Sequence, residues 1–244
     1  MRIILSDSTQ EAVNTVATMV LERIGSHPGS VIGLATGRTM EPVYEKWAAS
    51  AHASGTDHSK CFFFMLDEYL GIREGHPSSF RSYIEKRVLA PLKLHTDQIA
   101  FPPVHAAPAH EAAARYEQLL KEAGGVDLQL LGIGGNGHVG FNEPGSLKNS
   151  RTRLVELTPE TMKANQGDFP DGDMPSKAIS MGIETIMDAK YLVMLATGKS
   201  KADAIKYLLN HHDDPTCPAT YLKNHPNFTI VLDPDAASKI NLKI

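Results

Sequence analysis

The chain has 244 residues, of which 42% are hydrophobic and 21% charged, so it is long enough to bury a substantial core. Its formal net charge of −4 excludes strong long-range attraction to nucleic acid or an anionic membrane, so an anionic ligand must be held by local groups. The N-terminus is too polar for a signal peptide, and no apolar run is long enough to span a membrane. We therefore expect a single cytoplasmic domain over residues 1–244, with neither nucleic acid nor a membrane as a partner.

Short β-rich runs alternate with amphipathic helical stretches along the chain. The expected strands are 2–5, 31–35, 61–66, 128–133, 191–196 and 228–232. The expected helices are 10–24, 41–53, 79–89, 109–123 and 199–210. Helices between buried strands are typical of crossover connections, so the pattern predicts a Rossmann-like three-layer α/β/α sandwich with a mostly parallel central sheet.

One segment interrupts this alternation. Residues 164–176 are rich in Gly, Pro, Asp and Asn, which predicts a loop. We interpret residues 158–176 as a candidate active-site lid.

Neither the cysteines nor the glycine-rich segments predict a common cofactor site. Cys61 and Cys217 form no C-x-x-C pair, which favours reduced structural thiols over a disulfide or a zinc framework. Gly132 to Gly137 matches the G-x-G-x-x-G pattern of dinucleotide sites, but that pattern needs a helix to begin in the turn, and Pro144 and the nearby glycines prevent one. The segment TGKS at 197–200 lacks the upstream glycine of a P-loop, so ATP hydrolysis is not predicted either.

Polar and glycine-rich segments follow four of the expected strands. They read TGRT, LDEY, IGGNGHVGFNEPG and ATGKSK. In open α/β sheets, ligands bind beyond the carboxyl ends of the strands. The four segments therefore predict one shared pocket.

The third of these segments carries a histidine and a carboxylate. Asn136 precedes His138 by two residues, and Glu143 follows it by five. In a glycine-rich turn, Glu143 can hydrogen-bond one ring nitrogen and leave the other to exchange a proton with substrate. The alternative is a histidine that caps a loop carbonyl, and these three residues alone favour that alternative.

The second segment places two adjacent carboxylates after a buried strand. Burial raises the pKa of a carboxyl group, which would suit Asp67 to act as a general base. The alternative for Asp67 and Glu68 is an exposed turn or a helix cap, and an isolated Asp-Glu pair favours it.

The first and fourth segments suit an anion. Thr36, Gly37, Arg38 and Thr39 supply backbone amides, hydroxyls and a guanidinium before a helix, and Lys201 begins another helix. Phosphate binding and a plain strand-to-helix turn are equally consistent with these local signals.

Taken together, the motifs resemble glucosamine-6-phosphate deaminases over nearly the whole chain. The matching segments are LATGRT (34–39), LDEY (66–69), GIGGNGHVGFNEPG (132–145), SRTR (150–153) and SMGIETIM (180–187). The resemblance implies a Rossmann-like fold that is also similar to those of 6-phosphogluconolactonase and ribose-5-phosphate isomerase. It further implies an enzyme without a metal or an organic cofactor, which isomerises and deaminates an amino-sugar phosphate.

The resemblance also implies a role for each matching residue. Asp67 matches the base that removes the C2 proton, and His138 matches the group that opens the sugar ring. Glu143 and Asn136 match the partners of that histidine, although some members of the family carry aspartate where this chain has Asn136. The substrate-binding residues would be Thr36, Gly37, Arg38, Thr39, Gly135 and Lys201.

Three departures leave the substrate and the regulation open. The family's phosphate loop usually lacks Arg38, and its lid usually carries an arginine where this chain has Gly167. Arg38 could replace that charge, or the substrate could be galactosamine 6-phosphate or a non-phosphorylated amino sugar. A 6-phosphogluconolactonase-like hydrolase is the next alternative, followed by a sugar-phosphate sensor. Val155 stands where allosteric members have a lysine, so we expect no such effector site, and the oligomeric state stays open.

Overall fold

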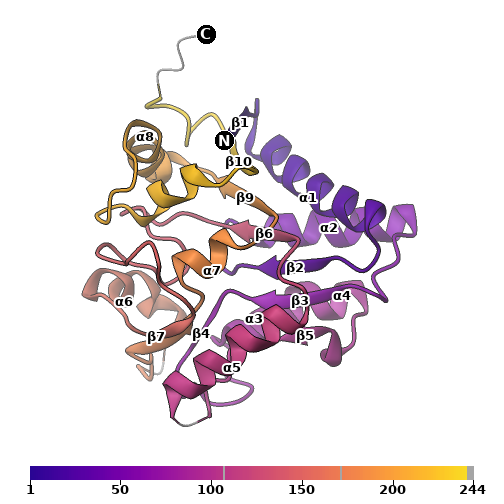
Figure 1. Cartoon of the computed structure of the whole chain (residues 1–244). Helices are drawn as coiled ribbons and strands as arrows, with labels where there is room; N and C mark the ends of the chain where they lie inside the picture. The colour runs from indigo at the N-terminus through magenta and orange to yellow at the C-terminus, as the bar shows by residue number, and fades with distance from the viewer. Residues whose placement is uncertain (107, 171, 241–244) are drawn as a thin grey trace.

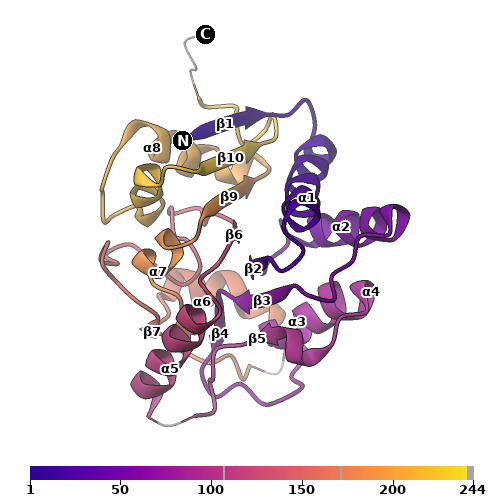
Figure 2. The ribbon, with the colours of Figure 1, turned by 45° about the vertical axis from the view of Figure 1, so that its right-hand side comes forward.

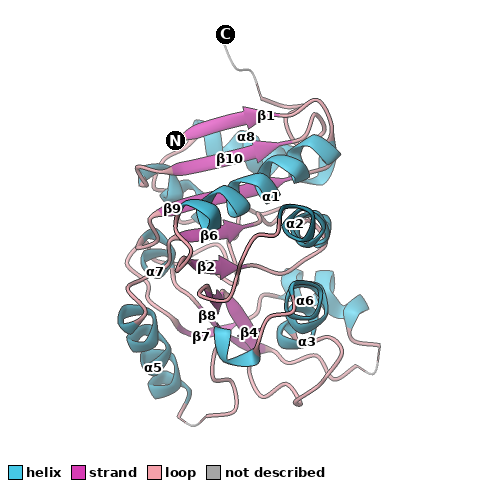
Figure 3. Cartoon of the chain, turned by 90° about the vertical axis from the view of Figure 1, so that its right-hand side faces the viewer, coloured by secondary structure: helices cyan, strands magenta, loops and turns pink. Residues whose placement is uncertain are grey.

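A parallel sheet forms the centre of the molecule. The computed structural model describes residues 1–106, 108–170 and 172–240. Seven strands pair in the order β1-β10-β9-β6-β2-β3-β5, all of them parallel, and the arrows of β1, β10, β6 and β2 point the same way in Figure 3. Their bounds are β1 Arg2–Leu5, β2 Val31–Leu34, β3 Phe62–Met65, β5 Ile99–Ala100, β6 Leu128–Leu131, β9 Tyr191–Ala196 and β10 Phe228–Leu232.

Helices cover both faces of this sheet (Figures 1 and 2). One face carries α1 (Thr9–Ser26), α2 (Glu41–Ser54) and α3 (Phe80–Ile84), which continues through a π-helical turn (Glu85–Leu89) into α4 (Ala90–Leu92). The other face carries α5 (Ala109–Glu122), α7 (Ile183–Met187) and α8 (Ala202–Asn210). The predicted three-layer α/β/α sandwich is therefore confirmed.

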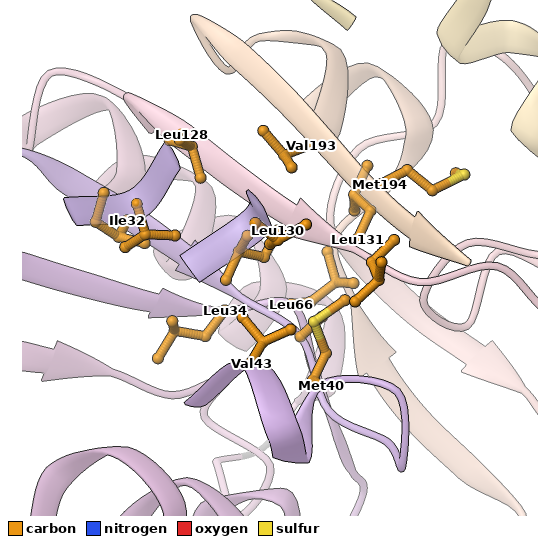
Figure 4. Packing of buried hydrophobic residues seen from close by; sticks show 14 of the residues in the cluster. Ile32, Leu34, Met40, Val43, Leu66, Leu128, Leu130, Leu131, Val193 and Met194 are labelled. Carbon is orange, nitrogen blue, oxygen red and sulfur yellow. The ribbon is translucent and has the colours of Figure 1, made fainter. Parts of the chain in front are cut away.

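The core explains why the central strands read as continuous apolar runs. Both faces of β2 and β6 are covered, so every residue of these two strands is buried. Figure 4 shows side chains of β2, β6 and β9 packed with Met40 and Val43 at the start of α2. Burying one such side chain stabilises the fold by roughly 1.5–3 kcal/mol. Because Met40 is fully buried, it anchors the end of the loop that follows β2.

A second, antiparallel sheet of three strands lies beside the first. It pairs β4 (Asp67–Tyr69), β8 (Lys177–Ser180) and β7 (Arg153–Glu156) in the order β4-β8-β7. Sequence periodicity did not predict these strands or β5, because they are two to four residues long and several carry charged residues. This small sheet matters for the site because β4 begins at Asp67.

The prediction of a loop at 164–176 is wrong for the first residues of that segment. Helix α6 (Pro159–Asn165) and a 3-10 turn (Gln166–Asp168) occupy the first part of the candidate lid, and Asp171 lies outside the described residues. The helix forms because the Thr158 hydroxyl accepts the backbone N–H of Thr161 and Pro159 occupies the first turn. The glycines and prolines that indicated a loop all follow Asn165.

Three smaller expectations concern thiols, the glycine fingerprint and the membrane. Cys61 and Cys217 are free and buried, as expected. Residues 132–152, all of them described, form turns and contain no helix, so the geometry of a dinucleotide site is missing there. Within the described ranges, none of the helices has both the length and the apolar character needed to cross a membrane.

Candidate active site

The four polar segments meet along one edge of the central sheet. Strands β9, β6, β2 and β3 are consecutive neighbours and parallel, so the loops that follow them leave the sheet on the same side. Chain order reverses between β2 and β6, which is where ligands bind in open α/β sheets. Two of the loops also touch, since a Cβ built on Gly135 would lie 4.0 Å from the backbone oxygen of Ser200.

Asp67 is the first residue of β4, and one residue separates it from the end of β3. It pairs with Ser180 of β8 and is only 4% exposed. Gly140 passes close to it with a φ of +55°, and a Cβ there would lie 2.9 Å from Asp67 Oδ2. Burial, reinforced by the neighbouring charge of Glu68, raises the pKa of Asp67 to about 8, although the Phe141 backbone N–H opposes this. Such a carboxyl group can exchange a proton near neutral pH.

Glu68 has a different environment and a structural role. Its Oε1 accepts hydrogen bonds from the backbone N–H groups of Tyr69 (2.9 Å) and Phe80 (3.0 Å), and its Oε2 accepts one from Arg81 (2.7 Å). Two of these donors belong to the first turn of α3, so Glu68 caps that helix. The helix-cap alternative is thus correct for Glu68 and not for Asp67.

Glycines shape the turn that presents His138. A Cβ on Gly134 would lie 2.3 Å from the imidazole ring, so only glycine leaves room for the ring at this position. Gly137 has a φ of +82°, and a Cβ there would meet the Sγ of Cys217 at 2.2 Å. The N–H of Gly134 donates to the His138 carbonyl, and the N–H of Gly137 donates to the Gly134 carbonyl. The glycines that imitate a dinucleotide fingerprint therefore build a histidine turn.

His138, Glu143 and Asn136 come together as predicted. His138 Nδ1 lies 3.4 Å from Glu143 Oε2, an ion-pair distance, but among the described residues it makes no hydrogen bond of good geometry. Asn136 connects the two residues, because its Nδ2 donates to Glu143 Oε2 (3.0 Å) and its Oδ1 accepts the His138 backbone N–H (3.1 Å). The expected direct hydrogen bond between ring and carboxylate is thus replaced by a slightly longer contact supported by Asn136.

Glu143 stays a carboxylate in this environment. Burial alone would raise its pKa, but interactions with His138, Thr161 and Asn136 outweigh burial and lower the pKa below its usual value. The Thr161 contact is a hydrogen bond in which the hydroxyl donates to Glu143 Oε1. A charged carboxylate at this place fixes the orientation of the His138 ring.

The residues expected to bind an anion lie on the two flanking loops. Thr36 and Thr39 are half-buried, and Gly37 and Arg38 are exposed in a turn where Gly37 has a φ of +109°. The Lys201 side chain is partly buried, and that burial lowers its pKa. Neither Arg38 nor Lys201 forms a salt bridge with any residue that the structure describes, so both cations are available to an anionic ligand.

Two residues near the site were not among the predicted site residues. Thr161 contacts Glu143 across 18 positions of sequence, a pairing that no local pattern reveals. Arg153 donates to Asn142 Oδ1 and Ser146 Oγ behind the same loop, and burial lowers its pKa. The motif SRTR includes Arg153 and could have drawn attention to it.

No cluster of three or more His, Cys, Asp or Glu side chains suited to a metal ion occurs within 1–106, 108–170 and 172–240. The groups on this edge of the sheet are instead suited to proton transfer. Asp67 can take a proton from carbon, and His138 can exchange one with an oxygen, while nearby cations can hold a negatively charged group.

The fold and the site together define a Rossmann-like α/β protein with an acid-base site at the carboxyl edge of its sheet. Comparison with known proteins narrows this class. The chain belongs to the family described as glucosamine-6-phosphate isomerases/6-phosphogluconolactonase, whose sequence model matches residues 5–231.

Named relatives cover almost the whole chain. A glucosamine-6-phosphate deaminase of Rhodopirellula baltica is 42% identical over 234 residues, which span 95% of this chain and 93% of that protein. The corresponding protein of Shouchella clausii is 41% identical over 239 residues, 98% of this chain and 97% of its own length. A solved structure described as a monomeric glucosamine-6-phosphate deaminase is 35% identical, with a TM-score of 0.95, and covers 98% of this chain and 100% of that one. A 6-phosphogluconolactonase from Trypanosoma cruzi shares the fold, with a TM-score of 0.77 and 18% identity. The match covers 99% of this chain and 97% of that one.

Proposed function

We propose that this chain converts glucosamine 6-phosphate and water into fructose 6-phosphate and ammonia. The observation that carries the proposal is the pairing of a buried carboxyl group, Asp67, with the His138 and Glu143 turn that packs against it. A lactonase needs no base to remove a carbon-bound proton, so the Asp67 environment favours the deaminase reaction. The names of relatives about 40% identical over nearly the full chain support it independently.

The first step is opening of the pyranose ring. His138 exchanges the proton between the C1 hydroxyl and the ring oxygen, which breaks the C1–O5 bond and leaves an aldehyde at C1. Glu143 stabilises the cationic imidazole during this transfer, and Asn136 holds Glu143 in place. The turn built by Gly134 and Gly137 holds the ring of His138 in place.

The second step is isomerisation by proton transfer at carbon. Asp67 removes the C2 proton, and the electrons form a C1–C2 double bond while the C1 oxygen gains a proton. Return of a proton to C1 moves the double bond to C2 and nitrogen. Water then adds to C2 and ammonia leaves, which gives the ketose phosphate. Asp67 can serve in both proton transfers because its pKa of about 8 lies near the working pH.

The phosphate is held by the flanking loops in this proposal. Thr36, Gly37, Arg38 and Thr39 lie in the turn after β2, and Lys201 lies in the 3-10 turn after β9. Gly135 lies beside that turn and lets the substrate approach the backbone. The candidate lid over 158–176 would cover the sugar, and residues 1–244 would act as one domain.

An ammonia-release assay tests the proposal. We expect release from glucosamine 6-phosphate, with fructose 6-phosphate as the second product, and much slower release from galactosamine 6-phosphate, glucosamine and N-acetylglucosamine 6-phosphate. Faster release from galactosamine 6-phosphate or from free glucosamine would reassign the substrate. Hydrolysis of 6-phosphogluconolactone without ammonia release from any amino sugar would show that the chain is a lactonase.

A further inference from the structure

The two oxygens of the Glu143 carboxylate have separate partners. Oε2 faces the catalytic turn, where it accepts a hydrogen bond from Asn136 and lies 3.4 Å from His138 Nδ1. Oε1 faces the candidate lid, where it accepts a hydrogen bond from the hydroxyl of Thr161 on α6. A carboxylate group is planar, so partners on both oxygens fix its rotation as well as its position.

His138 depends on that orientation. Its Nδ1 is buried, and Glu143 is its one polar neighbour at ion-pair distance among the residues that the structure describes. The ring also lies close to Gly134, which has no side chain to hold it. A rotation of the Glu143 carboxylate would therefore leave the imidazole without a group to orient it.

Thr161 is buried and firmly placed. It is 5% exposed, and its backbone N–H donates to the capping hydroxyl of Thr158. Helix α6 is also attached at its other end, where Asn165 Nδ2 donates to the Tyr69 hydroxyl at 3.0 Å. The loss of the Thr161 hydroxyl would thus leave α6 attached while freeing one oxygen of Glu143.

We propose that Thr161 is a positioning residue for ring opening, which orients Glu143 and through it the His138 imidazole; this role rests on the proposed function. The candidate lid then contributes directly to the geometry of the acid-base pair. Thr161 touches no reacting atom itself and acts through the Glu143 carboxylate alone.

The test compares three variants at positions of one helix. Thr161→Val removes the hydroxyl and keeps the shape of the side chain, and Thr161→Ser keeps the hydroxyl. Glu160→Gln changes an exposed side chain of the same helix and serves as the control. We expect Thr161→Val to lower kcat for glucosamine 6-phosphate roughly tenfold, because a hydrogen bond to a charged group is lost. KM should change little, Thr161→Ser should recover most of the rate, and Glu160→Gln should remain within about twofold of the wild type.

A second substrate separates positioning from a general loss of structure. The 4,5-dideoxy analogue of glucosamine 6-phosphate cannot close a five- or six-membered ring, so Thr161→Val should turn it over at close to the wild-type rate. Equal losses on both sugars would overturn the proposal.

The NMR chemical shifts of the His138 ring at one fixed pH keep this test independent of the proposed activity. The ring signal is assigned by its disappearance in His138→Gln. Thr161→Val should change these chemical shifts, because the imidazole loses its orienting carboxylate, whereas Glu160→Gln should not. If the wild type releases no ammonia, the proposed function fails; if it does and the His138 signals are identical in Thr161→Val, the positioning role fails.

Discussion

Asp67 and Glu68 are adjacent, almost fully buried carboxyl groups that the fold uses in different ways. Three backbone N–H groups satisfy Glu68, and it caps α3. Asp67 faces the Gly140 turn and, within the described part of the chain, has no comparable set of donors, so burial dominates its pKa. Burial removes most of the water around Asp67, and this desolvation raises its pKa into a range suited to proton transfer.

Replacing Asp67 should separate binding from catalysis. Asp67→Asn removes the base and keeps the shape, so we expect kcat for ammonia release to fall on the order of a hundredfold to ten-thousandfold with little change in KM. In the wild type, kcat/KM should rise with pH up to about 8, because only ionised Asp67 can accept the C2 proton. Near-normal turnover by Asp67→Asn would exclude Asp67 as the base.

The same replacement should stabilise the fold at high pH. Between pH 4 and 8, folded Asp67 retains a proton that the unfolded chain releases, because its pKa of about 8 lies above the ordinary value. The wild type therefore loses about 1.4 kcal/mol of stability per pH unit from this group, and Asn has no such loss. Urea denaturation should show Asp67→Asn to be more stable than the wild type at pH 8 and similar to it at pH 4. Parallel pH dependences would contradict the raised pKa.

We expect the loss of His138 to slow turnover of the closed sugar more than turnover of an open-chain analogue. His138→Gln keeps a polar side chain but cannot take up a proton, so kcat for the pyranose should fall on the order of a hundredfold. The 4,5-dideoxy analogue needs no ring opening and should react at close to the wild-type rate. Steady-state kinetics on the two sugars measure the difference. Similar losses on both would assign His138 to isomerisation or to support of the loop.

At the scale of elements, short connections build the site. The chain passes from β3 into β4 within one residue, which carries Asp67 from the central sheet to the small one. Glu68 of β4 accepts hydrogen bonds from the start of α3. Thr161 of α6 donates a hydrogen bond to Glu143 in the turn that follows His138. The position of each functional side chain therefore depends on an element that is distant in sequence.

The Glu68 cap gives an element-scale prediction. Glu68→Ala leaves the N–H groups of Tyr69, Phe80 and Arg81 without their acceptor, so we expect the free energy of unfolding to fall by roughly 2 kcal/mol or more. Urea denaturation at pH 7 measures this change. Glu85→Ala, which removes a partly exposed carboxylate later in the same helical segment, serves as the control and should cost less than about 0.5 kcal/mol. Equal stabilities of the two variants would exclude the capping role.

At the scale of the whole molecule, the residues proposed to bind an anion come from both ends of the chain. Arg38 follows β2, Lys201 follows β9, and both lie at the edge that holds Asp67 and His138 because β9, β6, β2 and β3 are neighbours. The net charge of −4 provides no general attraction for a sugar phosphate. In the proposed function, affinity for the phosphate therefore depends on these local cations.

Arg38 should compensate for the missing lid arginine. Arg38→Gly should raise KM for glucosamine 6-phosphate roughly ten- to a hundredfold, since a charge-assisted hydrogen bond contributes about 1.5–3 kcal/mol. A Cβ on Gly167 would have no neighbour within 4 Å, so the lid has room for a side chain there. The double variant Arg38→Gly with Gly167→Arg should recover part of the affinity. An unchanged KM in Arg38→Gly would contradict the hypothesis that Arg38 replaces the lid arginine in binding the phosphate.

Much of the fold could be predicted from the sequence alone. The buried strands are apolar on both faces, so β2, β3, β6, β9 and β10 appear as runs that local composition reveals. Polar residues after four of these runs indicated a single edge, and the parallel pairing of β9, β6, β2 and β3 confirms that they share one. The helix at the start of the lid was missed because the Gly and Pro residues that follow Asn165 dominated the segment's composition.

The sequence by itself determined the class of fold and the candidate residues, because burial, periodicity and glycine content are local properties of the chain. Only the tertiary structure decided which of two adjacent carboxyl groups is a cap, since the two helix N–H groups that donate to Glu68 belong to residues 12 and 13 positions away. It also decided that Thr161 meets Glu143 and that Gly140 meets Asp67. Contacts between distant segments depend on how whole elements pack, and no local pattern of residue types contains that information.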